Sequence, residues 1–195
     1  PAGNKEIGAP MVRREHMMTD QTTRFDDPGF DAAAHARKSA QSLAVVQAME
    51  AALGAGANDM RPYFHEDSRW MGNYGCGTKE GVEAFRQNWQ LPLRAAFSER
   101  TYLTDRFLAD GDWVSCFGHI EATHSGPFMG IAPTGRRVQV PYIDFWLIRD
   151  GKIADNWVNV DLASVLFQLG EDVFGGRGWE AFDRGETTPP APVQG

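Results

Sequence analysis

The spacing of hydrophobic positions changes part-way along the chain. Over residues 31–53, strong helix formers carry apolar Leu43, Val46 and Met49 at three-residue steps, and Gly54 follows as a stop. In the second half the spacing falls to two, in segments rich in Val, Ile, Phe, Tyr and Trp. The pattern therefore predicts helices first and strands afterwards.

A short second helix is expected directly after the first one. Asn58 is a suitable cap, and Met60, Tyr63 and Phe64 supply an apolar side up to about Asp67. A short strand is expected next, over residues 69–71.

The run that begins at Thr78 is typical of a helix start, and Pro92 is expected to bend or end this helix. Its apolar residues are spaced for one face: Val82, Phe85, Trp89 and Leu93.

Period-two alternation predicts strands over residues 100–109, 113–124, 138–149 and 152–159. Asp110-Gly111 and Asp150-Gly151 lie between these segments, and Asp-Gly favours the left-handed geometry of a tight hairpin turn.

A last short helix is expected from Asp161, as its cap, to Gly170, as its stop. Helices followed by an antiparallel meander indicate an α+β domain, in which a curved sheet wraps around the packed helices. Such a cone is hollow at its mouth.

The two ends differ from the domain that we place at residues 31–185. Residues 1–30 are polar and rich in Gly and Pro, which predicts a flexible arm. The His16-Met17-Met18 junction resembles a cloning scar, so part of the arm is expected to derive from a vector. Residues 186–195 hold three prolines and no apolar cluster, which predicts a disordered tail.

Composition narrows the function. With 195 residues and 42% apolar content, the chain can bury one sizeable core. A net charge of -7 disfavours binding to nucleic acid and to anionic lipid. We find neither a membrane-spanning run nor a secretory signal, so we expect a soluble, cytoplasmic protein. Cys76 and Cys116 are too few for a disulfide framework and are read as apolar filler, although His119 near Cys116 leaves a catalytic thiol open.

Asp161 is our first candidate for a catalytic base. Alternation places it on one side of the last strand with Asp155, Trp157 and Asn159. If this side faces an apolar cavity, burial would raise the pKa of Asp161 into a useful range. The alternative is that Asp161 only caps the final helix.

Asp144 and His124 are the other two candidates. Asp144 lies in an apolar, aromatic strand, where a buried carboxyl needs a partner, a proton or a wet cavity. It could act as an acid, or it could be a buried structural Asp. His124 is the last residue of a predicted strand, and its neighbours on the same face are small and apolar. It could polarise a carbonyl, although a histidine on an apolar face is more often structural.

Four aromatic residues could line the cavity and bind a flat polycyclic or steroid-like ligand: Trp70, Phe85, Tyr142 and Trp157. Most aromatics in such a fold belong to the core, so only one or two are expected to touch a substrate. His65, Glu66 and Asp67 are adjacent in sequence and lack convergent metal-ligand geometry, so we predict no metal.

Several motifs, in order, resemble the SnoaL-like polyketide cyclase branch of the nuclear-transport-factor-2-like superfamily. They span about residues 40–170 and are Phe64-His-Glu-Asp-Ser-Arg-Trp70, Gly75 through Gly81, His124-Ser-Gly-Pro-Phe-Met-Gly-Ile-Ala-Pro-Thr-Gly135, Asp150-Gly-Lys-Ile-Ala-Asp-Asn-Trp157, Asp161 and Gln168-Leu-Gly170.

The resemblance implies a cone-shaped α+β barrel with a deep apolar pocket, dimeric or higher through the outer sheet face. It also implies an acid/base carboxylate that closes a polyketide ester ring by an aldol reaction, without metal or organic cofactor. The family position of that carboxylate is matched to Asp161. His124 or Asp144 takes the partner role, and Asn159, Trp70, Tyr142 and Trp157 would position the substrate rings.

Three functions stay open. The first is a cofactor-independent enzyme acting on a hydrophobic carbonyl compound, most like a polyketide cyclase. The second uses the same pocket for dehydration, isomerisation or hydrolysis, because two acids and a His also suit loss or addition of water. The third is a small-molecule carrier of the same fold without catalysis.

Overall fold

The computed structural model describes residues 29–186. The predicted arm and tail lie almost entirely outside these residues. Contacts divide the chain after Ala32, and the fold below belongs to the unit that begins at Ala33.

The described residues form a six-stranded sheet in the order β2-β1-β6-β5-β4-β3. The strands are β1 (Phe64–Gly72), β2 (Thr78–Glu80), β3 (Phe97–Asp110), β4 (Trp113–His124), β5 (Arg137–Arg149) and β6 (Lys152–Val160). All neighbouring pairs are antiparallel except β1 and β6, which are parallel. The sheet is therefore mixed where the alternation predicted a purely antiparallel meander.

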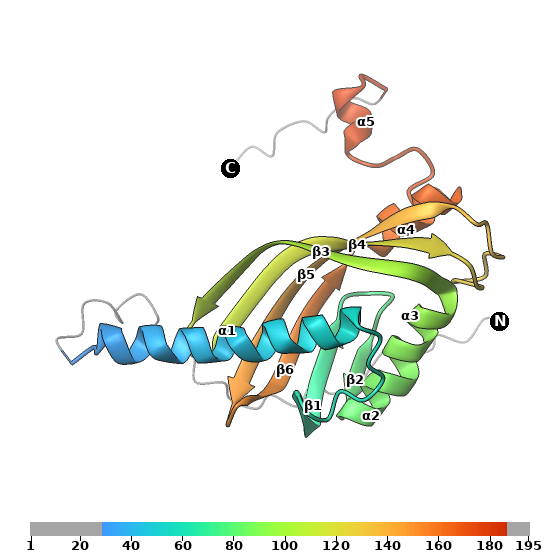
Figure 1. The fold of residues 1–195 in the computed structure, drawn as a ribbon. Coiled ribbons are helices and arrows are strands. Elements are labelled where there is room, and N and C mark those ends of the chain that lie inside the picture. The colour runs from blue at the N-terminus through green and yellow to red at the C-terminus, as the bar shows by residue number, and fades with distance from the viewer. Residues whose placement is uncertain (1–28, 187–195) are drawn as a thin grey trace, which may run out of the picture. The chain divides into compact units, whose positions relative to one another are not determined.

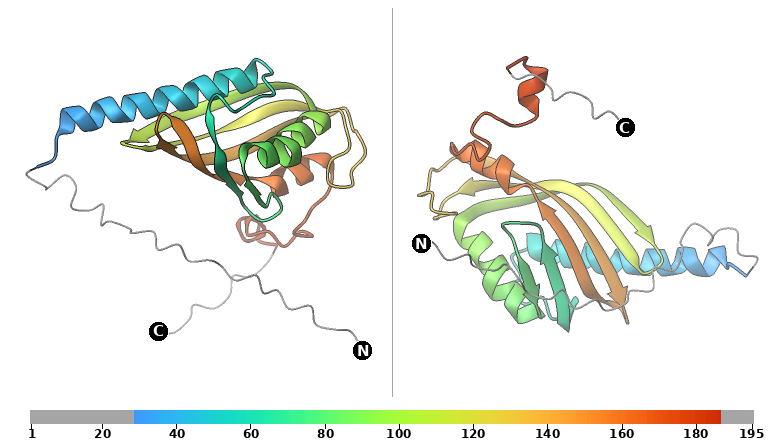
Figure 2. Two further views of the ribbon diagram at one scale, coloured as in Figure 1. Left: turned by 90° about the horizontal axis from the view of Figure 1, so that it is seen from below. Right: turned by 180° about the vertical axis from the view of Figure 1, so that it is seen from behind.

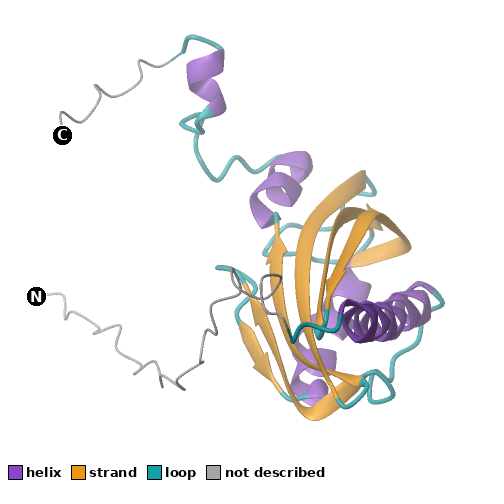
Figure 3. Ribbon diagram, turned by 90° about the vertical axis from the view of Figure 1, so that its left-hand side faces the viewer, coloured by secondary structure: helices purple, strands orange, loops and turns teal. Residues whose placement is uncertain are grey.

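The helices are α1 (Ala32–Gly54), α2 (Val82–Phe85), the π-helical turn η2 (Arg86–Gln90), α3 (Leu91–Ala96), α4 (Leu162–Leu169) and α5 (Glu180–Asp183). Helix α1 crosses the sheet, and α2 and α3 lie at one end (Figure 1). Figure 3 shows α1 end-on, within the curve of the strands. The α+β prediction is confirmed, with a curved and unclosed sheet around the helices.

The predicted hairpins are confirmed. Asp150 and Gly151 have φ of 48° and 74°, so both adopt the left-handed geometry that a tight two-residue turn requires. Gly111, with φ of 60°, joins β3 to β4. These turns join β3 to β4 and β5 to β6, and pairing of β4 with β5 lays all four strands side by side, as the two further views show (Figure 2).

The helix predicted between Asn58 and Asp67 is wrong. Strand β1 begins at Phe64 and pairs on one edge with β2 and on the other with β6. Within the predicted helix, the Ile153 N–H of β6 donates to the Tyr63 carbonyl at 2.8 Å and Phe64 pairs with Ile153, and this tertiary pairing outweighs the local helix signal.

The third predicted helix begins later than expected. Residues Thr78–Glu80 form β2, and the helix starts only after Gly81, whose φ is 86°. Before Pro92, which has no N–H to donate, the helix widens, and the Leu91 N–H reaches the Arg86 carbonyl five residues back. Helix α3 then continues to Ala96, so the helical run does not end at Pro92.

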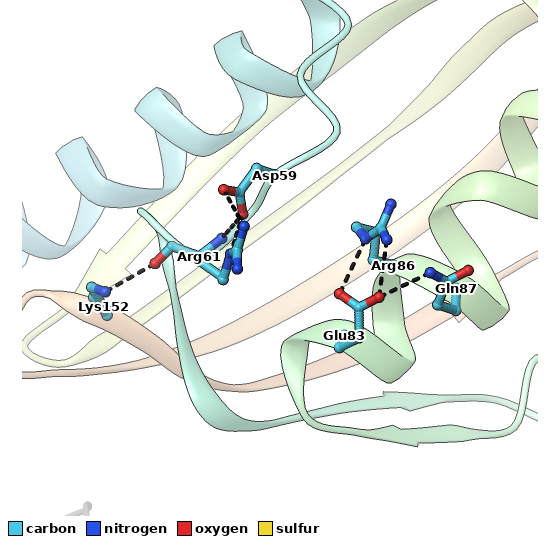
Figure 4. A network of polar contacts seen from close by, with 6 residues as sticks. All are labelled: Asp59, Arg61, Glu83, Arg86, Gln87 and Lys152. Carbon is cyan, nitrogen blue, oxygen red and sulfur yellow. Dashed lines mark hydrogen bonds and ion pairs between the residues drawn. The ribbon is translucent and has the colours of Figure 1, made fainter.

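Surface ion pairs hold the loop before β1 and the start of α2 (Figure 4). Arg61 binds Asp59 through Nε and Nη2 at 2.8 and 2.9 Å, and the Lys152 Nζ donates to the Arg61 carbonyl at 2.9 Å. Glu83 accepts from Arg86 in the same way. Exposed pairs of this kind contribute little stability, so they mainly orient the loop.

The core lies between the helices and the concave face of the sheet. Val46 and Met49 of α1 pack there with the inward side of β4 and β5, which carries Val114, Ile120, Val138 and Val140 among others. Among the helices described, none combines the length and the apolar content needed to cross a bilayer.

Candidate active site

A cavity of about 90 Å³ lies inside the curve of the sheet. Helix α1, the α2–η2–α3 run and the inward faces of β1, β3, β4, β5 and β6 line it. Most of its wall is apolar, and its polar side chains include Glu50, Gln90, Arg94, Tyr102, Tyr142, Asp144 and Asn156. An apolar hollow with a few convergent polar groups is the usual form of a small-molecule site.

Stacked aromatic rings form one wall of the cavity. The Trp70 ring lies 4.5 Å from that of Trp89 and 6.0 Å from that of Phe85, and Phe64 stacks on Phe85 at 5.5 Å, all between centroids. The structure thus places the predicted Trp70 and Phe85 on the cavity wall. Such a flat aromatic surface suits a planar ring system.

Asp144 is the acid of the cavity. Its Oδ1 accepts a hydrogen bond from Asn156 Nδ2 at 2.9 Å, across the β5–β6 pair. Burial raises the pKa of Asp144 to about 7; the bond from Asn156 opposes this rise and the nearby Glu50 carboxylate adds to it. Near neutral pH this carboxyl can therefore both release and take up a proton.

A second polar group faces the cavity from α1. The Thr104 hydroxyl lies 2.8 Å from Glu50 Oε1 and 2.7 Å from the Tyr142 hydroxyl. Burial raises the pKa of Glu50, and the hydrogen bonds oppose part of this rise. The predicted Tyr142 thus lines the cavity within a hydrogen-bonded chain.

Two buried polar atoms on cavity-lining residues have no hydrogen-bond partner among the described residues. They are Gln90 Oε1, whose Nε2 donates to the Ala57 carbonyl at 2.9 Å, and Trp146 Nε1. A buried acceptor and a buried donor left unpaired are costly, so they are natural partners for polar groups of a bound molecule.

The predicted inward face of β6 is wrong. Asn156, Val158 and Val160 line the cavity, whereas Trp157 and Asn159 point to the opposite face of the sheet. There Trp157 stacks on Trp113 at 5.2 Å, and Asn159 is exposed.

A β-bulge reverses this face. At the hairpin, Ile148 pairs with Ile153, but the next residue, Leu147, pairs with Asp155, so Ala154 is an extra residue in β6. One extra residue exchanges the two faces of everything that follows it. As a result Asp155 turns outward, where Arg69 binds it at 2.7 and 2.6 Å.

Asp161 lies outside the cavity, at the corner between β6 and α4. Its Oδ1 accepts a hydrogen bond from the Ser164 N–H at 2.9 Å, as an N-cap. Gly170 ends this helix with φ of 105°. Asp161 is exposed and borders a shallow surface groove with Asn73 and Tyr74. The predicted cap is confirmed, and the predicted catalytic role stays a prediction that this position does not favour.

His124 is fully buried but does not line the cavity. Its ring lies 5.5 Å from Phe97 and 6.5 Å from Phe128, and its Nδ1 accepts from the Thr134 N–H at 3.3 Å. The structure therefore separates His124 from Asp144, and it brings Asp144, Tyr142, Trp70 and Phe85 to the same cavity.

Sequence reasoning missed Glu50, Gln90, Arg94 and Asn156 as cavity residues.

The possible catalytic thiol is Cys116, which lies on the same face of the sheet. Burial raises the pKa of Cys116, so its thiol stays protonated. The described residues contain no cluster of three or more His, Cys, Asp or Glu side chains suited to a metal.

Residues 43–169, most of the described chain, match the family described as SnoaL-like polyketide cyclase. The chain belongs to the SnoaL-like polyketide cyclase family. One relative in it, nogalonic acid methyl ester cyclase of Streptomyces nogalater, is 32% identical over 125 residues, which are 63% of this chain and 91% of the relative. Another, aklanonic acid methyl ester cyclase AcmA of Streptomyces galilaeus, is 29% identical over 135 residues, 67% of this chain and 92% of its own.

Two solved structures agree with the fold. TsrD from Streptomyces laurentii has a TM-score of 0.59 at 26% identity, over 67% of this chain and 96% of its own. A SnoaL-like protein from Jannaschia sp. CCS1 has a TM-score of 0.61 at 22% identity, over 67% and 92%.

Proposed function

We propose that this SnoaL-like protein closes a ring in a polyketide ester by acid/base catalysis, with Asp144 as the group that moves the proton. The observation that carries the proposal is a carboxyl on the wall of an apolar cavity with a pKa of about 7. Two relatives are named as cyclases of polyketide methyl esters, which supports this class of substrate.

The chemistry needs one proton carrier. The Asp144 carboxylate takes a proton from carbon next to a substrate carbonyl, and the electron pair of that C–H bond forms an enolate. The enolate carbon attacks a second carbonyl of the same molecule, which forms the new C–C bond and leaves an alkoxide. Protonated Asp144 returns its proton to this oxygen, so the step consumes no other reagent and needs no cofactor.

The surroundings of Asp144 suit this role. Asn156 fixes the carboxyl through its hydrogen bond of 2.9 Å, and the rings of Trp70 and Phe85 can hold the flat part of a substrate. The N–H of Trp146, two residues along the same strand face, is available to an oxygen that gains negative charge.

We assign the base to Asp144 in place of Asp161. Asp161 already uses its carboxylate to cap α4, and it is exposed outside the cavity. The sequence left His124 and Asp144 open as partners of the base. His124 does not line the cavity, so we give it no part in the reaction.

The outer face of the sheet is proposed to join two copies of the chain. Its strands expose Phe117, Ile143 and Phe145, which are 44%, 48% and 49% exposed and lie next to each other across β4 and β5. A contiguous apolar patch of this kind is typical of a subunit interface. Phe145→Glu should convert a dimer into a monomer in analytical ultracentrifugation, and an unchanged sedimentation coefficient would reject this interface.

The test of the function uses the two methyl esters in the relatives' names, nogalonic and aklanonic acid methyl ester. Incubation with the protein should convert at least one of them to a product of equal mass and changed retention in chromatography, because ring closure yields an isomer of the substrate. The rate should survive treatment with a chelator. Conversion at the rate of buffer alone would contradict the proposal.

A further inference from the structure

Glu50 lies at the end of a hydrogen-bond chain that reaches Tyr142 in the cavity. Its Oε1 is 2.8 Å from the Thr104 hydroxyl, which in turn is 2.7 Å from the Tyr142 hydroxyl. The three groups come from α1, β3 and β5, and Glu50 and Tyr142 both line the cavity.

A glycine lets this chain form. Thr104 pairs with Gly118, and Gly118 pairs with Tyr142, so the three residues make one row across β3, β4 and β5. Because Gly118 has no side chain, nothing separates the two hydroxyl groups above it. A Cβ at this position would also come within 2.3 Å of the Leu103 carbonyl oxygen.

The proton count fixes the direction of the chain. A hydroxyl has one proton to donate, and an ionised carboxylate can only accept. When Glu50 is ionised, Thr104 donates to it and must accept from Tyr142, so Tyr142 can offer the cavity only lone pairs. When Glu50 is protonated, it can donate to Thr104; Thr104 can then donate to Tyr142, which leaves the Tyr142 proton free for the cavity.

We propose that Glu50 is a positioning residue of this site: the proton that it holds or releases decides whether Tyr142 donates to, or accepts from, the bound molecule. This rests on the proposed function, because it assigns the molecule a carbonyl or enolate oxygen that needs a donor. A ketone draws a proton onto Glu50, and an alcohol binds to either state.

Glu50 can exchange its proton with solvent. It borders both the cavity and a shallow outer groove, which it shares with Gln47 and Arg100. Burial raises the pKa of Glu50, which brings the protonated state closer to neutral pH.

Other ionisable and charged groups face the same region and must be separated from Glu50. They are Arg94 from α3, Arg100 and Tyr102 from β3, Cys116 from β4 and Asp144 from β5. Burial raises the pKa of Tyr102 and of Cys116, so neither group loses its proton within an ordinary range of pH. Asp144, with a pKa of about 7, does titrate in that range, so the test replaces it with asparagine.

The test measures the binding of two small probes in the Asp144→Asn background, by quenching of tryptophan fluorescence from pH 4.5 to 8.5. The probes are 1-tetralone, which only accepts, and 1-tetralol, which also donates. The Kd of tetralone should rise about tenfold with pH, the size of one hydrogen bond, while that of tetralol changes less. Calorimetry in two buffers should show proton uptake with tetralone.

Three variants locate the cause. Glu50→Gln and Thr104→Val should each make the Kd of tetralone independent of pH, because the first removes the titrating group and the second interrupts the chain. Gln47→Ala, on the same helix and the outer groove, should keep the dependence. Circular dichroism checks that each variant folds.

A pH dependence that persists in Glu50→Gln would overturn the inference. A dependence that is lost in Glu50→Gln and kept in Thr104→Val would also overturn it, because the charge of Glu50 would then act without the chain. Since these measurements need no turnover, a failure of the methyl ester assay alone would reject the ring-closing function and leave this result standing.

Discussion

Asp144 lies within β5 and Asp161 directly follows the neighbouring strand β6, and their surroundings give these two carboxylates different chemistry. Asp144 lies in an apolar cavity, where burial raises its pKa to about 7. Asp161 lies at the surface, where its side chain accepts a hydrogen bond from the Ser164 N–H and caps α4. The comparison teaches that the place of a carboxylate in the fold, rather than its residue type, decides whether it can exchange a proton near neutral pH.

The largest difference is expected in turnover. Asp144→Asn should lower kcat by about 10²- to 10⁴-fold, the usual contribution of a positioned acid/base group. Asp161→Asn should change kcat by less than a few-fold, since asparagine also caps a helix. Steady-state kinetics on the converted methyl ester measures both, and equal losses would erase the distinction between the two sites.

Stability should depend on pH through Asp144. Its folded pKa of about 7 lies above the ordinary 3.8, so the folded state binds the proton more tightly. The stability from this proton is complete below about pH 4 and is lost as pH rises to about 7, by on the order of 4 kcal/mol. Between pH 5 and pH 8, the free energy of unfolding measured with urea should fall less in Asp144→Asn than in the parent. An equal fall in both proteins would mean that Asp144 is exposed to solvent.

A smaller change should follow when the partner of Asp144 is removed. The bond from Asn156 lowers the pKa of Asp144, so Asn156→Ala should raise it further, by up to about one unit. The acidic limb of the profile of kcat/KM against pH should move upward by that amount. Leu93→Ala, on the part of the cavity wall that α3 supplies, serves as the control and should leave the limb in place.

The smallest effect concerns the helix cap. Asp161→Ala should lower the free energy of unfolding by about 1 kcal/mol, whereas Asp161→Asn should cost almost nothing. Urea titration at pH 7 distinguishes them. A loss well above 2 kcal/mol in the alanine variant would mean that Asp161 does more than cap α4.

Local signals predicted much of this fold. Helix α1, the two Asp-Gly hairpins and the inward side of β4 and β5 depend on neighbours in sequence, so periodicity found them. Residues 69–71 of strand β1 were predicted as a strand, but its first half was missed because its pairing with β6 joins residues about 90 positions apart. Such contacts leave no trace in local spacing.

The candidate site was predicted only in part. Asp144, Tyr142, Trp70 and Phe85 were found, because a carboxyl or aromatic group in an apolar run stands out. Trp157 and Asn159 were placed on the wrong face by a single bulge. Glu50 was missed because a glutamate on a long helix is ordinarily a surface residue, and only the packing of α1 over the cavity makes it otherwise.

The bulge at Ala154 also decides where the chain can tolerate a change in length. Loss of that one residue would leave Ile153 and Asp155 on alternate sides, so Asn156 and the two valines beyond it would keep their inward orientation. The same loss later in β6 would exchange cavity and surface for every position after the deletion. Related chains that differ by one residue in this hairpin therefore preserve the same chemistry only when the gap falls at the bulge.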